Sequence, residues 1–88
     1  MHLTTLAELT EAAAAYVTHV EGLEEFTRPQ VMRHVVATGQ PMTRSRENLL
    51  RTFGTLMRQG TMQRSRRGQF ELSRDSEFGE QARRFAQG

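Results

Sequence analysis

Apolar residues near the start of the chain recur at three- and four-residue spacing, as along the buried face of an amphipathic helix. An alanine run at residues 12–15 adds strong helix propensity. Glu8 and Glu11 suit the positive end of a helix dipole, and Gly22 is placed to end the helix. The pattern therefore predicts a helix from about residue 4 or 5 to Val20. Its expected inner face consists of Leu6, Leu9, Ala13, Val17 and Val20.

A second helix is predicted after a short segment that is expected to be extended and to bring Phe26 into the core. The triplet Thr-Arg-Pro at residues 27–29 is a strong helix start, because threonine caps free amides and proline is tolerated in the first turn. Gly39 and the pair Gln40-Pro41 are expected to end this helix. Its expected inner face consists of Val31, Val35 and Val36, with Met32 beside them.

The third predicted helix, at about residues 43–59, has a strongly apolar face. Leu49, Phe53 and Leu56 recur at helical spacing, and Leu50 and Met57 flank them. This face is expected to pack into the core of the domain.

Two features of this third helix are left open by its sequence. Thr43 is the expected N-cap and Ser45 the competing one, which would leave Arg44 in the preceding turn. Gly54 costs about 1 kcal/mol relative to alanine in a helix interior. It either allows the first or second helix to approach closely or is a tolerated weak point.

Opposite Phe53, at 100° per residue, the same helix presents a polar stripe. Arginine and asparagine can pair bidentately with the edges of guanine and adenine, as the side chains of a major-groove helix do. A solvated face usually mixes signs of charge, whereas Glu47 is the only acid here. The expected base-reading residues are Arg44, Ser45, Asn48, Arg51 and Thr55.

Beyond Gly60 the helical period changes to alternation, which predicts a β-hairpin. Its strands are expected at residues 61–64 and 69–72, with a tip at residues 65–68. Glu71 is the only acid within the hairpin, so the arginines at the tip should repel one another unless they meet a polyanion. The residues expected to point inward are Met62, Phe70 and Leu72, and the arginines at or beside the tip are Arg64, Arg66 and Arg67.

The last predicted helix, at residues 76–86, places Phe78, Ala82 and Phe85 on one face. This face is either a homodimer contact or a flap over the domain's own core, and we expect the dimer. The expected organisation is one domain at residues 1–74 followed by a dimerisation or capping element at residues 75–88.

Charge is segregated along the chain. Residues 1–26 contain five glutamates and no arginine, for a net charge of −5. Residues 27–74 contain ten arginines against two glutamates, for a net charge of +8, and residues 75–88 have a net charge of −1. A basic block of this kind indicates a polyanionic partner.

Composition excludes several other classes of function. The chain has no cysteine, its three histidines lack metal-ligand spacing, and nothing resembles a nucleotide loop or a catalytic triad. We therefore expect no enzyme activity, cofactor, metal or small-molecule effector. No apolar run approaches the roughly 18 residues of a membrane span, and no secretory signal is evident, so a cytoplasmic location is expected. A domain of this size without a disulfide or a structural metal is expected to be only marginally stable as a monomer, which favours oligomerisation.

The order of the predicted elements, with the segment FTRPQVMRHVVATGQPMTRSRENLLRTFGTLMRQGTMQRSRRGQFELS, resembles the prokaryotic winged helix-turn-helix regulators over about residues 5–73. The resemblance is one of pattern and points to no single family within that group. It implies a mostly α fold with a three-helix core, a two-stranded wing and a short C-terminal helix. It also implies that the third helix enters the major groove, the second crosses the backbone and the wing covers phosphates or the minor groove.

The expected function is sequence-specific binding of double-stranded DNA by a homodimer, as a repressor or a plasmid- or phage-type regulator that acts by occupying a promoter. The alternative is a winged helix that binds a protein through its acidic first helix, such as a phage-type inhibitor or an assembly subunit. The residues expected to contact the DNA backbone are Arg28, Arg46, Arg58, Arg64, Arg66 and Arg67.

Overall fold

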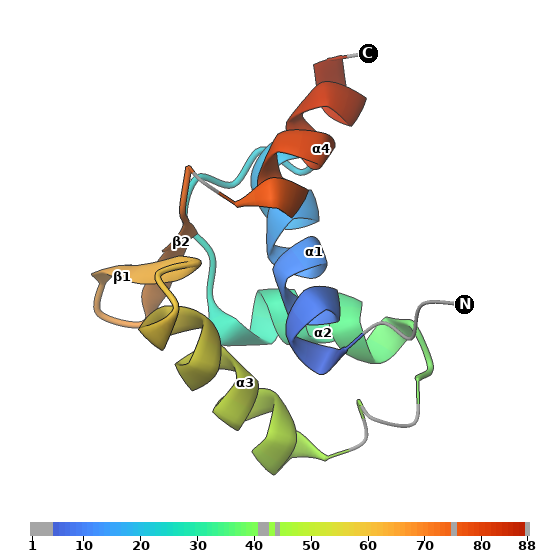
Figure 1. Ribbon diagram of the computed structural model, residues 1–88, viewed down its shortest axis with the longest axis vertical. Helices are drawn as coiled ribbons and strands as arrows, with labels where there is room; N and C mark the ends of the chain where they lie inside the picture. The colour runs from blue at the N-terminus through green and yellow to red at the C-terminus, as the bar shows by residue number, and fades with distance from the viewer. Residues whose placement is uncertain (1–4, 41–42, 44, 75, 88) are drawn as a thin grey trace.

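The computed structural model describes residues 5–40, 43, 45–74 and 76–87 (Figure 1). Helices dominate this part of the chain, together with one two-stranded antiparallel sheet, as the sequence predicted. In chain order the elements are α1 Leu6–His19, α2 Arg28–Ala37, α3 Arg46–Arg58, β1 Met62–Arg66, β2 Gln69–Leu72 and α4 Glu77–Gln87.

The first two helices begin where local chemistry predicts. Thr5 and Thr27 each accept a hydrogen bond from the backbone amide three residues later, and the side chains of Glu8 and Gln30 each accept one from the amide of the capping threonine. These reciprocal capping boxes satisfy amides that a helix start leaves free.

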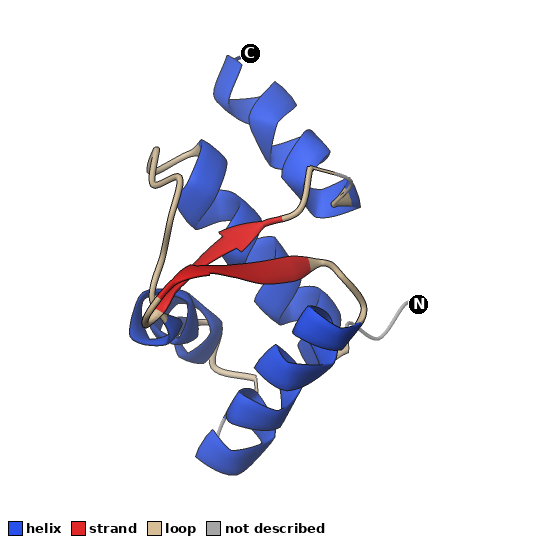
Figure 2. Cartoon of the chain, turned by 90° about the vertical axis from the view of Figure 1, so that its left-hand side faces the viewer, coloured by secondary structure: helices blue, strands red, loops and turns tan. Residues whose placement is uncertain are grey.

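Helix α1 is the element on which the other helices pack, and it contacts α2, α3, α4 and β2 (Figures 1 and 2). Its small alanine side chains permit this close approach. Ala14 and Ala15 are buried beneath the neighbouring elements, and Val17 is buried as well. The core that forms around it consists of Ala13, Ala14, Val17, Phe26, Val31, Val35, Leu49, Phe53, Leu56, Met62 and Phe70.

Phe26 joins the connection between α1 and α2 to the hairpin. Its amide donates to the carbonyl of Phe70 at 2.9 Å, and the Phe70 amide donates back to the Phe26 carbonyl at 2.8 Å. The Phe70 ring lies 5.9 Å from that of Phe53, centroid to centroid. The expected extended conformation and burial of Phe26 are therefore confirmed, and one antiparallel bridge ties the edge of the hairpin to the helical core.

The start of the third helix corrects the prediction. Ser45, not Thr43, is the N-cap, since the Ser45 hydroxyl accepts from the amide of Asn48 at 3.2 Å and the helix begins at Arg46. Thr43 is buried, and its hydroxyl donates to the carbonyl of Gln40 at 2.7 Å, so it is committed to the preceding turn. Arg44, expected at the head of the polar stripe, lies outside the described residues.

The inner face of α2 is narrower than predicted. Val31 and Val35 are fully buried, whereas Val36 is 51% exposed. Val36 follows Val35 by one residue, and each residue turns the side chain by about 100° around the helix axis. Its side chain therefore points away from the core.

The hairpin tip is shorter than predicted. Strand β1 continues to Arg66, which pairs with Gln69, and an irregularity between Arg64 and Arg66 absorbs the extra residue Ser65. The turn itself consists of Arg67 and Gly68, and Gly68 has a φ of 75° that favours glycine. The inward positions Met62 and Phe70 are buried as expected.

Helix α4 packs on α1 of the same chain. The Ser76 hydroxyl donates to Glu11 Oε2 at 2.6 Å and accepts from the Gly79 amide at 3.1 Å, which fixes the start of α4 beside α1. Gly79 allows α4 to lie close to the end of β2, because a Cβ there would lie only 2.9 Å from a Leu72 methyl carbon.

Candidate functional site

The polar face of α3 is exposed along most of its length. Asn48 and Arg51 are exposed and Thr55 is partly buried. Glu47 accepts from Arg51 at 3.2 Å, so the one acid of this face offsets the charge of one of its arginines. The Thr55 hydroxyl accepts from Arg58 at 3.2 Å, and the Ser45 hydroxyl caps the helix. Of the predicted base-reading residues that the structure describes, Asn48 and Arg51 are the exposed ones.

A groove lies where the start of α2, the first half of α3 and the hairpin tip converge. It has a volume of about 300 Å³, and Arg28 and Arg46 line it together with Leu50, which is 42% exposed. Sequence reasoning treated Leu50 only as a flank of the core face. Its full lining, here called the tip groove, is Arg28, Pro29, Met32, Arg46, Leu50, Gly68 and Phe70.

The tip groove continues along α2 and α3 into a second apolar hollow of about 510 Å³. Pro29, Met32 and Arg46 belong to both, and the exposed Val36 lies at the far end. The surface between α2 and α3 is therefore apolar on its floor and cationic at its rim.

Two arginines lie against the ring of Phe70. The Arg28 guanidinium is 5.0 Å from the ring centroid and that of Arg64 is 6.0 Å away, both within range of a cation–π interaction. The Arg28 Nε atom is buried and has no hydrogen-bond partner among the described residues. Burial of Phe70 thus orients positive charge from α2 and from β1 at one end of the hairpin.

The hairpin arginines are less free than the sequence suggested. Arg66 Nε lies 3.0 Å from Glu25 Oε2, in the connection between α1 and α2, so an acid distant in sequence neutralises it. Glu71 instead accepts from its cross-strand neighbour Gln63. Arg67, in the turn, is exposed and forms no ion pair within the described part of the chain.

Two of the three predicted dimerisation residues, Phe78 and Ala82, lie at the junction of α1 and α4. Phe78 and Ala82 are partly buried and line an open groove of about 360 Å³ against the alanine surface of α1. The side chain of Phe85 lies outside the described part of the structure. The other residues of this groove are Ala12, Ala15, Tyr16, Val20 and Gln81.

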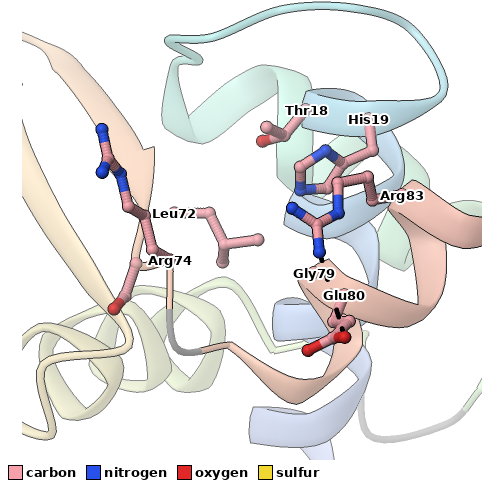
Figure 3. A pocket seen from close by; sticks show the side chains of 8 residues that line it. Thr18, His19, Leu72, Arg74, Gly79, Glu80 and Arg83 are labelled. Atoms are coloured by element: carbon pink, nitrogen blue, oxygen red, sulfur yellow. Dashed lines mark ion pairs between the residues drawn. The ribbon is translucent and has the colours of Figure 1, made fainter.

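A further pocket of about 320 Å³ lies between the end of α1, the end of the hairpin and α4 (Figure 3). Arg83 turns toward Glu80, at 3.9 Å, and Arg74 extends away from His19 and Arg83 (Figure 3). Of the two arginines that line this pocket, Arg83 is therefore close to an acid of the protein itself and Arg74 points away from the other lining side chains.

Among the described residues no cluster of His, Cys, Asp or Glu could hold a metal ion. Within the same part of the chain, none of the helices is long and apolar enough to cross a membrane. Comparison with protein-family models, with characterised proteins and with solved structures finds no match.

Proposed function

We propose that the protein is a winged helix-turn-helix DNA-binding protein that contacts duplex DNA through α3, the start of α2 and the hairpin. The order of elements supports this proposal, because α1, the extended residue Phe26, α2, α3 and the hairpin follow one another as they do in that fold. The bond pair between Phe26 and Phe70 supports it further, since it joins the hairpin to the helical core as a wing.

The observation that carries the proposal is the convergence of arginines from three elements at the hairpin tip. Arg28 of α2 and Arg46 of α3 line one groove with Gly68, and Arg64 of β1 lies over the same Phe70 ring as Arg28. The Phe70 ring attracts Arg28 and Arg64, but these charges still repel one another, and no acid pairs with Arg28, Arg46 or Arg64 in the described part of the chain. The phosphate backbone of duplex DNA supplies the opposite charge at close, regular spacing.

Binding would divide between positioning and recognition. Arg28, Arg58 and the hairpin arginines would hold phosphates, while α3 would present Asn48 and Arg51 to base edges in the major groove. A homodimer would occupy the two half-sites of a DNA operator. Its proposed interface is the groove between α1 and α4 that Phe78 and Ala82 line. Regulation would then consist of occupying a promoter.

The alternative is a protein-binding module that uses the acidic side of α1. It is supported less well, because little of the surface of α1 is left exposed for a partner. Helix α1 is covered by α2, α3 and α4, and Glu11 is already engaged by Ser76.

A salt series with labelled duplex DNA tests the proposal. Log K should fall linearly with log salt, with a slope of about −0.9 for each phosphate that an arginine neutralises. Replacing Arg64 and Arg67 with glutamine should flatten that slope by up to about two units per protomer. The pair Arg83→Gln and Arg84→Gln removes the same charge from α4, where both arginines lie near Glu80, and should leave the slope almost unchanged. Absence of duplex binding, or equal losses in both double variants, would reject this function.

A further inference from the structure

Leu50 occupies the side of α3 that faces the hairpin tip. It lines the tip groove with Gly68 and is flanked by the basic side chains of Arg28 and Arg46. At 3.6 residues per turn, Asn48 lies about 200° away around the same helix. Leu50 and Asn48 therefore lie on nearly opposite sides of α3, and they cannot both face the centre of one DNA groove.

The position of the hairpin decides which side a duplex would meet. In the proposed binding mode the DNA touches α3 and the wing at the same time. Leu50 and Arg46 are the α3 residues that share a groove with the hairpin tip. If the proposed function holds, this side of α3 faces the bases, and an apolar side chain stands among the base-contacting residues.

The chemistry of that side chain restricts the base it can accept. A leucine neither donates nor accepts hydrogen bonds, so a base edge rich in amino and carbonyl groups would lose its water without compensation. The C5 methyl group of thymine is the apolar feature that the major groove displays, and apolar side chains contact it. Arg28 and Arg46, which line the same groove, carry the positive charge that the phosphates flanking such a base would attract.

We infer that Leu50 is a specificity-determining residue that contacts the methyl group of a thymine in the DNA major groove. This inference rests on the proposed function and refines it. Within that contact it puts Leu50 and Arg46 nearest the centre of the groove, so that Asn48, on the other side of α3, meets a base edge only at the margin of the contact.

The test deletes that methyl group alone. A preferred duplex is first selected from a random library with the wild-type protein, and each thymine is then replaced in turn by deoxyuridine, which retains the pairing and the carbonyl groups. At one thymine per half-site, wild-type affinity should fall by about fourfold, the change expected for burying one methyl group.

Three variants assign the effect to Leu50. Leu50→Ala should abolish the difference between thymine and deoxyuridine at that position, and Leu50→Met, which keeps an apolar side chain, should retain it. Leu23→Ala is the matched control, since Leu23 is a similarly exposed leucine (38%) in the connection between α1 and α2, and it should behave as wild type. Leu50→Gln, close in volume, gives the same comparison if the alanine variant is poorly folded.

The outcomes separate the two proposals. A wild-type protein that selects no duplex would overturn the proposed function itself. Selective binding with no methyl effect, or with the same effect in Leu50→Ala, would overturn only the role of Leu50. In that case capture of an acidic, apolar-anchored peptide by the tip groove would be the competing use of this surface.

Discussion

Glu25→Gln probes whether the hairpin contacts DNA, as proposed, because it removes the acid that pairs with Arg66 in the free protein. The pair is close, 3.0 Å from Arg66 Nε to Glu25 Oε2, but the Arg66 side chain is 73% exposed and that of Glu25 is 31% exposed. Exposed pairs of this kind stabilise a fold by about 0.2–1 kcal/mol. We therefore expect the substitution to lower the melting temperature by at most about 4–8 °C in a domain of this size.

The effect on DNA binding should have the opposite sign. Once Glu25 is neutral, Arg66 can reach a phosphate without first leaving a partner, and one more phosphate contact makes the salt slope steeper by about 0.9. Between about 50 and 200 mM salt, that change corresponds to an additional loss of roughly threefold in affinity. At low salt the variant should bind more tightly than wild type.

The assay is fluorescence anisotropy with a labelled duplex over this salt range, together with a thermal melt of each protein. Glu24→Gln is the matched control, because Glu24 is the adjacent exposed acid and has no ion pair in the described part of the chain. Adding Arg66→Gln to the Glu25 variant should remove the gain. If Glu25→Gln and Glu24→Gln change the slope equally, Arg66 does not meet a phosphate, which would contradict the proposed role of this part of the hairpin.

Three further predictions concern the fold and its assembly. Phe53→Ala, at a position 1% exposed, should cost about 3–5 kcal/mol in urea unfolding, and an unchanged midpoint would contradict the assignment of the core face of α3. Gly54→Ala should raise stability by about 1 kcal/mol in calorimetry, because the nearest atom to the new Cβ is Arg58 Nη1 at 3.6 Å; a lower melting temperature would reveal a constraint not visible at this glycine. Ala82→Glu should dissociate the proposed homodimer in sedimentation and weaken binding to paired half-sites, because it places a charge in the groove between α1 and α4; a dimer that persists would place the interface elsewhere.

The starts of the first two helices could be predicted from the residues next to them. Thr27 caps α2 as predicted, and the start of α1, expected at residue 4 or 5, follows the cap Thr5. Such starts can be predicted because a cap depends only on residues about three positions apart. The same logic selected Thr43 wrongly, since its hydroxyl is used by the carbonyl of Gln40 in the preceding turn. Two neighbouring hydroxyl residues can both suit a cap, and which one serves depends on how the turn before the helix closes.

The candidate site was predictable in its charge and not in its arrangement. Clustered arginines indicated a polyanion without any knowledge of the fold. The partnership of Arg66 with Glu25 joins segments far apart in the chain, so no local pattern could predict it. The role of Leu50 could not be predicted either. A helical wheel places it beside the core face, and its exposure in a groove depends on where the hairpin tip lies.

The bridge between Phe26 and Phe70 has a consequence for how this protein is made. In a growing chain α1 and α2 leave the ribosome before the hairpin, so Phe26 at first has neither its backbone partner nor the cover of the hairpin. Because this pairing closes a long loop, its entropic cost is met only when the late core residues Met62 and Phe70 are available. The nascent protein should therefore stay sensitive to proteases until about residue 72 has emerged, and then become resistant in a single step.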